Sequence, residues 1–141
     1  MRASIVLIAA LALAACGAPA GAPTPEAGAD MDHRAAIERY YRAYRDRDRA
    51  ALDTLLTDDF RFRSSFGGFD GRDAMLDAIW PMVGRSWATN LRIYGEPPEY
   101  IVLYENEAEP GVEHPRVHMA ERIRFEGDHI AEIEVFIGPG E

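Results

Sequence analysis

The order of apolar patterns along the chain predicts an α+β domain in which a curved sheet wraps around N-terminal helices. Residues 33–46 carry apolar side chains at helical spacing, whereas residues 60–66 alternate apolar and polar side chains at strand spacing. From residue 90 onward, turn residues separate further segments that all have strand character. Helices first and a run of strands last is an α+β order.

Three helices are expected before this run of strands. The first has its apolar side chains at i, i+3, i+4 and i+7, at Ile37, Tyr40, Tyr41 and Tyr44. A second, short helix over residues 50–56 is expected to start after Asp48, because an Asp side chain can accept hydrogen bonds from the free amides of a first turn. A third covers residues 72–80 and ends at Pro81, which has no amide hydrogen.

The strands are predicted from alternation and from the turns between them. They are expected at residues 60–66, 90–94, 100–106, 116–125 and 130–137. Pro97-Pro98 and Gly127-Asp128 have the composition of turns, and Gly67-Gly68 is expected to end the first strand. Residues 107–115 are acidic and contain Pro and Gly, which predicts an exposed loop.

The first 15 residues have the composition of a secretory signal peptide. Arg2 precedes an apolar run over residues 5–15, which is too short to cross a bilayer as a permanent helix of about 20 residues. Leu13-Ala14-Ala15-Cys16 resembles the lipobox of bacterial lipoproteins, which implies a lipid on Cys16. The alternative is ordinary cleavage that leaves Cys16 as a free thiol.

Residues 16–32 differ in composition from both neighbouring segments. They are rich in Gly, Ala and Pro and are expected to form a flexible linker, followed by one domain over residues 33–141. Such a protein would be held on the extracytoplasmic side of the cell envelope. Its contact with the membrane would be through the lipid only, and the sequence leaves the inner and the outer membrane open.

Composition and missing motifs exclude several classes of function. The net charge of −9 disfavours nucleic acid as a partner, because phosphate binding needs a basic surface. Glycine-rich phosphate loops, Cys/His zinc spacings and Gly-x-Ser-x-Gly elbows are missing from the sequence, so we expect no cofactor. His114 and His118 would lie about 13 Å apart along a strand, too far to share a metal ion, so no metal is expected.

Four stretches of the sequence resemble the SnoaL-like branch of the NTF2-like superfamily. They are IERYYRAY at 37–44, LLTDDF at 55–60, FDGRDA at 69–74 and AERIRFEGDHIAEIE at 120–134. The resemblance implies an NTF2-like cone, a curved and mostly antiparallel sheet wrapped around N-terminal helices. It places an apolar pocket between the first helix, the third helix and the concave face of the sheet. Members include ketosteroid isomerases, polyketide cyclases and dehydratases, and many are homodimers.

Glu121 is an acidic residue on an apolar strand face. It shares that face with Val117, Met119, Ile123 and Phe125. A carboxylate placed there must either become protonated or find hydrogen-bond donors. One interpretation puts Glu121 near the sheet edge or beside an arginine. The resemblance implies another, in which Tyr40 and Glu121 correspond to the catalytic Tyr and acid that form the oxyanion hole of ketosteroid isomerases.

The expected site departs from those isomerases at the general base. The matching position is Ser64, whose hydroxyl cannot remove a carbon-bound proton without an activating partner, so steroid isomerisation is not expected. The expected pocket residues are Tyr40, Tyr44, Phe62, Ser64, Met119 and Glu121. We expect His33 to be exposed at the start of a helix, and Trp80 and Trp87 to be core residues or walls of the pocket mouth.

Three functions remain open on this basis. The first is a small-molecule binding domain whose pocket takes a modest apolar or amphipathic ligand. The second is an enzyme of cyclase, isomerase or dehydratase type that polarises a carbonyl through Tyr40 and Glu121. The third is an interaction module in an envelope assembly. An open cavity would favour the first two, and a sealed interior the third.

Overall fold

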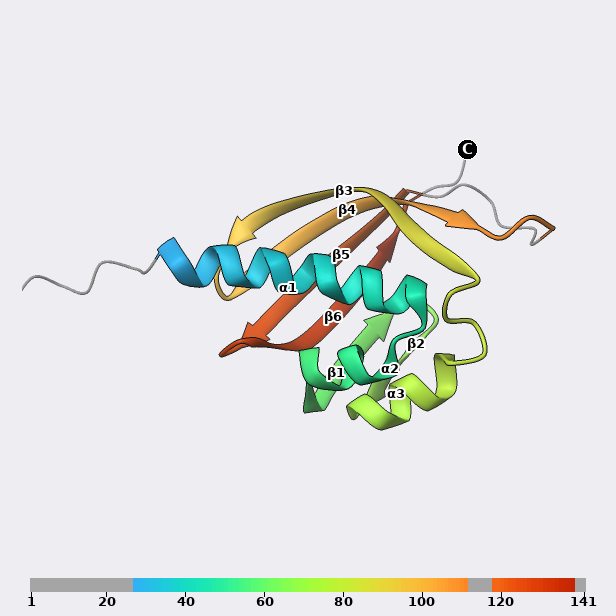
Figure 1. Cartoon of the computed structure of the whole chain (residues 1–141), viewed down its shortest axis with the longest axis horizontal. Coiled ribbons are helices and arrows are strands. Elements are labelled where there is room, and N and C mark those ends of the chain that lie inside the picture. Colours follow the sequence, from blue (N-terminus) through green and yellow to red (C-terminus); the bar gives the residue numbers. More distant parts are fainter. Residues whose placement is uncertain (1–26, 112–117, 139–141) are drawn as a thin grey trace, which may run out of the picture.

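The computed structural model describes residues 27–111 and 118–138, with side chains from His33 onward. The helices are α1 (Ala27–Asp46), α2 (Arg49–Leu55) and α3 (Arg72–Ile79). The strands are β1 (Leu56–Ser64), β2 (Gly67–Asp70), β3 (Ser86–Glu96), β4 (Glu99–Ala108), β5 (His118–Glu126) and β6 (His129–Ile137). The predicted α+β class is confirmed, with helices preceding most of the sheet (Figure 1).

The strands form one sheet in the order β2-β1-β6-β5-β4-β3. Neighbouring strands are antiparallel except β1 and β6, which run parallel, with Phe62 paired to Ile133. Hairpins connect β3 to β4 and β5 to β6, around the predicted turns at Pro97-Pro98 and Gly127-Asp128. The sheet is therefore mixed but mostly antiparallel, as the sequence predicted.

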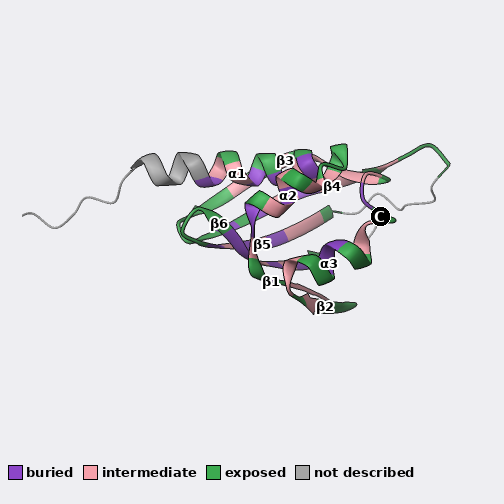
Figure 2. Cartoon of the chain, turned by 60° about the horizontal axis from the view of Figure 1, so that its bottom comes forward, coloured by how far each residue is buried: buried purple, intermediate pink, exposed green. Residues whose placement is uncertain are grey.

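The helices lie against the sheet and close the core. Figure 1 shows α1 running along the curve of the sheet, with α2 and α3 beside β1 and β2. The contacts agree, because α1 touches β3 and α2, while α3 touches β1 and β2. Buried positions occur along both the helices and the strands (Figure 2). Fully buried side chains include Ile37, Leu52, Phe60, Tyr100, Ile123 and Ile133.

Two local features start the short helices where the sequence predicted. The Asp48 carboxylate accepts a hydrogen bond from the Ala51 amide at 3.0 Å, which caps α2. Gly71 precedes α3 with φ of 96°, a backbone conformation that residues with a Cβ rarely adopt. Trp80 then ends α3 immediately before Pro81. These residues fix how α2 and α3 enter the fold.

Several element boundaries differ from the prediction, among them the start of β3 at Ser86 instead of residue 90, and one strand was not predicted. α1 begins at Ala27 instead of residue 33, because a helix held by packing further along adds residues at its end at little cost. β1 begins at Leu56 instead of Phe60, since its first residues follow β6 across a bulge. β2 was not predicted, because only its pairing with β1 makes a strand of a glycine-led segment.

The predictions for the N-terminal segment concern residues that the structure does not describe. The signal peptide over residues 1–15, Cys16 and the first part of the expected linker lie outside the described residues. Within the part of the chain that the structure describes, no helix combines the length and apolar character needed to span a membrane.

Candidate functional site

A cavity of about 550 Å³ lies between α1, α3 and the inner face of the sheet. Three of its walls are aromatic. Tyr40, Tyr41 and Tyr44 come from α1, Phe62, Phe66 and Phe69 from β1, β2 and the turn between them, and Trp87 and Tyr104 from β3 and β4. The volume is in the range of pockets that hold small organic molecules.

Glu121 is the acidic group of this cavity. It lies on β5 with only 6% of its surface exposed, and both of its carboxylate oxygens accept hydrogen bonds. The Tyr41 hydroxyl donates to Oε2 and the Tyr104 hydroxyl donates to Oε1, each at 2.6 Å. We call Glu121, Tyr41 and Tyr104 the carboxyl cluster. It joins α1 to β4 and β5 at the cavity wall.

Strand alternation keeps the arginines of β5 away from the carboxyl cluster. Arg122 and Arg124 point to the opposite face of the sheet, where Arg122 pairs with Glu132 at 2.8 Å and Glu134 at 2.9 Å. Among the described residues, Glu121 forms no ion pair with any arginine. The interpretation of Glu121 as one half of an ion pair is therefore wrong, and its partners are tyrosine hydroxyls.

Burial dominates the electrostatics of the cluster. It raises the pKa of Glu121, and the hydrogen bonds from Tyr104 and Tyr41 partly oppose that rise because they stabilise the charged form. Burial likewise raises the pKa of Tyr41 and Tyr104, and the nearby Glu121 carboxylate raises it further. The tyrosines therefore remain neutral donors, while the carboxyl can exchange its proton at a higher pH than an exposed glutamate.

Tyr40 lines the cavity, but it is not the donor to Glu121. Tyr41 and Tyr104 are the donors, so among the described residues the expected pair of Tyr40 and Glu121 shares the cavity without a direct hydrogen bond. Successive helical residues point about 100° apart, so the rotation of α1 about its axis decides which tyrosine reaches the carboxyl. A sequence stripe that contains both tyrosines does not specify that rotation.

Ser64 also lines the cavity, with its hydroxyl engaged locally. It donates to the Gly67 carbonyl at 3.1 Å and accepts from the Phe66 amide at 3.3 Å. These bonds close the turn between β1 and β2, a common role for serine. Among the described residues, Ser64 forms no side-chain hydrogen bond that would activate its hydroxyl as a base.

The remaining expected pocket residues all reach the cavity. Tyr44, Phe62 and Met119 line it together with Trp87. Trp80 instead packs against the core, with the guanidinium groups of Arg47 and Arg49 above its ring at 5.9 and 5.6 Å. Tyr44, Phe62 and Met119 therefore occupy the predicted place in the cavity wall. That they bind a ligand stays a prediction.

The expectation for His33 was wrong. Its side chain is buried, its ring stacks on Phe125 with centroids 4.1 Å apart, and Nε2 lies 2.9 Å from the Gly127 carbonyl oxygen. The turn between β5 and β6, which contains Gly127, lies against His33 and buries it. A local sequence pattern cannot show this contact, because the two residues are far apart in the chain. Among described residues, no group of His, Cys, Asp and Glu side chains is arranged to hold a metal ion.

Sequence reasoning missed Tyr41 and Tyr104 as partners of Glu121. A signal for Tyr104 was present, because Tyr100, Val102 and Tyr104 alternate on one strand face. Tyr104 pairs with Met119 and is therefore diagonal to Glu121, within reach of a long side chain. That signal required the register between β4 and β5, which the sequence does not give.

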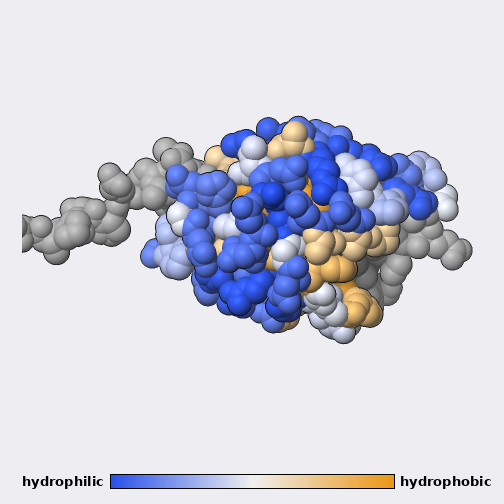
Figure 3. All heavy atoms as spheres, turned by 90° about the horizontal axis from the view of Figure 1, so that it is seen from below, coloured by the Kyte–Doolittle hydropathy of each residue, from blue (hydrophilic) through white to orange (hydrophobic). Residues whose placement is uncertain are grey.

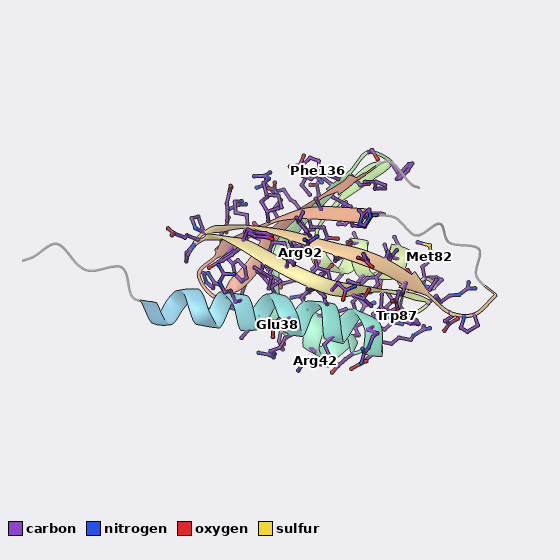
Figure 4. All side chains as sticks on the ribbon, turned by 90° about the horizontal axis from the view of Figure 1, so that it is seen from above. Glu38, Arg42, Met82, Trp87, Arg92 and Phe136 are labelled. Carbon is purple, nitrogen blue, oxygen red and sulfur yellow. The ribbon has the colours of Figure 1, made fainter. Side chains whose placement is uncertain are left out.

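Apolar side chains surround the open side of the cavity. Phe66 is 86% exposed and Met82 is 59% exposed, yet both belong to the cavity wall. Seen from below, the surface is largely hydrophilic, with hydrophobic residues gathered toward the end away from the start of α1 (Figure 3). Met82 and Trp87 lie at that same end of the molecule (Figure 4). Phe66, Met82 and Trp87 therefore offer apolar contacts to a ligand at this end of the cavity.

Comparisons with known proteins agree with this architecture. Residues 37–133 match the family described as the SnoaL-like domain. A candidate ketosteroid isomerase from Kribbella flavida has a TM-score of 0.69 at 16% identity, covering 79% of this chain and 82% of its own. A candidate polyketide cyclase from Sinorhizobium meliloti has a TM-score of 0.64 at 18% identity, covering 76% and 98%.

A third solved structure has another activity in its name. It is an LEH-like epoxide hydrolase from M. tuberculosis, with a TM-score of 0.67 at 15% identity, covering 77% of this chain and 84% of its own. No curated protein sequence matches the chain significantly. At these identities the likeness shows the NTF2-like fold, and the different activities illustrate that one fold carries many functions.

Proposed function

The chain belongs to the SnoaL-like domain family, and from this premise we propose that its domain binds a small apolar or amphipathic molecule in the cavity. One observation carries the proposal: eight aromatic side chains surround a cavity of about 550 Å³ that holds a single carboxyl group. Pockets of this kind bind through apolar contact and use a few polar groups to orient the ligand.

The arrangement of the walls favours a ligand with one polar end. The carboxyl cluster supplies the polar contacts on the β5 side, while Phe66 and Met82 provide apolar contacts on the open side. Burying apolar ligand surface contributes about 25 cal/mol per Å². The rings would therefore supply most of the binding energy, and Glu121 the orientation.

An enzyme that polarises a carbonyl is the second candidate. It is favoured by the raised pKa of Glu121, because a neutral carboxylic acid can donate a hydrogen bond to a developing enolate. Tyr40, from the same cavity wall, would be the second donor. A reaction that also removes a proton needs a base, however, and the Ser64 hydroxyl is engaged by Gly67. Binding therefore accounts for more of the geometry than catalysis does.

The sequence further supports a proposal about location. The signal-peptide pattern and the lipobox-like Leu13-Ala14-Ala15-Cys16 favour a lipid anchor on Cys16 and a place on the extracytoplasmic side of the cell envelope. A lipid-anchored domain with an apolar cavity would meet amphipathic molecules that partition into or leave a membrane.

Native mass spectrometry of the protein purified gently from its own envelope tests the binding proposal. We expect a co-purifying small molecule with the wild-type chain and its loss in Ala78→Phe, which fills the cavity from α3. Ala74→Phe is the matched control, because Ala74 is an exposed α3 residue outside the cavity wall. A bound molecule that survives Ala78→Phe, or a cavity that never yields one, would contradict the proposal.

A further inference from the structure

We propose that the ligand of this cavity is an organic cation, an amine or quaternary ammonium whose nitrogen lies beside Glu121 and whose carbon groups contact the tyrosine rings. The inference rests on the proposed function and specifies the chemistry of its ligand. Three observations on the cavity wall lead to it, together with the charge of the whole chain.

The first observation is the charge of the wall. Among the described residues that line the cavity, Glu121 is the only acidic one, and none is Arg, Lys or His. An anionic ligand would therefore find no counter-charge there and would be repelled by the carboxylate. Arg122 and Arg124, the arginines of β5, pair with glutamates on the outer face of the sheet. A cationic ligand would therefore supply the positive charge that these arginines do not bring to Glu121.

The second observation is the direction of the hydrogen bonds. Tyr41 and Tyr104 each use their one hydroxyl hydrogen on Glu121. Their oxygens can then offer only lone pairs to a ligand. The carboxyl cluster thus presents negative charge and acceptors, which complement an ammonium group better than they complement a carbonyl.

The third observation is the arrangement of the rings next to Glu121. The Tyr40 and Tyr41 rings are 5.2 Å apart with an interplanar angle of 76°, and the Tyr41 and Tyr104 rings are 5.3 Å apart at 62°. Inclined rings form walls in more than one direction. Aromatic faces attract cations, and cages of such rings around an acidic group are suited to alkylammonium ligands.

The charge of the whole chain acts in the same direction. Its net charge of −9 attracts cations and repels anions at a distance. Glu121 is the one acidic group among the described residues that line the cavity, so in its deprotonated form it adds a local attraction of the same sign as the long-range one. A cationic ligand would be favoured both during approach and when bound.

A pair of isosteric probes tests the charge directly. Choline and 3,3-dimethylbutan-1-ol have the same shape but differ in carrying a quaternary nitrogen or a neutral carbon. NMR titration of the full-length chain should give a dissociation constant at least about tenfold lower for choline, as expected for a cation held by rings and a carboxylate. Glu121→Gln should sharply reduce that preference, leaving only the part that the rings supply, and Glu134→Gln, which removes a charge from the outer face, should keep it in full.

A second measurement does not depend on a substituted protein. In the wild-type chain, choline affinity should rise with pH, because deprotonated Glu121 is the counter-charge, whereas the affinity for the neutral alcohol should stay constant. The titratable groups that face Glu121 are the hydroxyls of Tyr40, Tyr41 and Tyr44 from α1 and of Tyr104 from β4. Each has a pKa raised above the ordinary tyrosine value of 10.0, so all four stay neutral while Glu121 titrates.

The possible results separate the two proposals. Equal affinity for both probes, or a preference for the alcohol, overturns the cation proposal while leaving small-molecule binding intact. Failure of choline to bind at all also overturns it, whatever native mass spectrometry finds. A preference for choline that is undiminished in Glu121→Gln shows that Glu121 is not the counter-charge and overturns the assignment.

Discussion

At the scale of single residues, the buried Glu121 is stable in this fold because both of its oxygens have donors. A buried carboxyl without partners is costly, and hydrogen bonds from Tyr41 and Tyr104 offset that cost. Leucine at position 121 would leave those two hydroxyls without their acceptor, at roughly 1–3 kcal/mol for each unsatisfied group. An apolar residue at position 121 should therefore lower the unfolding free energy.

The pH dependence of stability should show the burial of Glu121. Its pKa in the folded protein is raised above the ordinary value of 4.5, so the native state binds this proton more tightly than the unfolded state. The stability that protonated Glu121 contributes is complete below the ordinary pKa of 4.5, and it is lost as the pH rises through the higher pKa of the folded protein. Glu121→Gln should therefore gain unfolding free energy relative to wild type between about pH 4 and about pH 8.

Urea unfolding of both proteins at the two pH values measures this difference. Glu134→Gln on the outer face of the sheet serves as the control and should show no such gain. A difference between Glu121→Gln and wild type that is the same at both pH values would mean that Glu121 has an ordinary pKa.

At the scale of elements, periodicity in the sequence predicted those helices and strands that have a local pattern of their own. The stripe from Ile37 to Tyr44, the cap at Asp48 and the alternation through Ile123 gave α1, α2 and β5. β2 escaped because a strand of four residues beginning Gly67-Gly68 has no pattern of its own. Strand ends such as Leu56 depend on a partner strand, so they could not be read from a local window.

In the candidate site, too, some features could be predicted from local pattern and others could not. Alternation alone located Glu121 on the apolar face, and helical spacing brought Tyr40 and Tyr44 to the cavity. The partners of Glu121 depend on helix rotation and on strand register, which are properties of packing. Residues that face inward are therefore predictable, whereas the bonds between them are not.

The cap of α2 permits a sharp test at this scale. Asp48→Ala removes the acceptor for the Ala51 amide and should lower the unfolding free energy by about 1 kcal/mol. Asp46→Ala is the matched control, since Asp46 is an exposed residue at the end of α1 that pairs only with exposed Arg45. Chemical denaturation of both variants gives the two values. Equal losses would show that the Asp48 bond contributes nothing specific.

At the scale of the whole molecule, the proposed anchor and the domain are separate along the chain. Cys16 precedes the first described residue by a segment rich in Gly, Ala and Pro. Among the described residues, the first buried side chains are those of His33 and Ile37. Attachment and folding should therefore be independent.

Cys16→Ser should move the protein from the membrane fraction to the soluble fraction without changing its thermal unfolding. The reason is that serine cannot carry the thioether-linked lipid, whereas the core of the described fold is built from residues that follow Cys16 by about 20 positions or more, beginning at Ala36 and Ile37. Fractionation of cells after a salt wash, followed by immunodetection, gives the distribution. Continued sedimentation of Cys16→Ser with membranes would contradict lipid anchoring, and wild type from the same cells is the reference.

The position of β6 has a consequence for how the domain acquires its structure. β6 lies between β1 and β5, so the β2-β1 pair and the β5-β4-β3 group are connected within the sheet only through the last strand. Before β6 is in place, those two parts can form separately but do not join within the sheet. Contacts this distant in sequence slow folding, because a long loop must close first. The decisive step in maturation of the domain is therefore the insertion of the nine residues of β6, His129–Ile137, between the two parts.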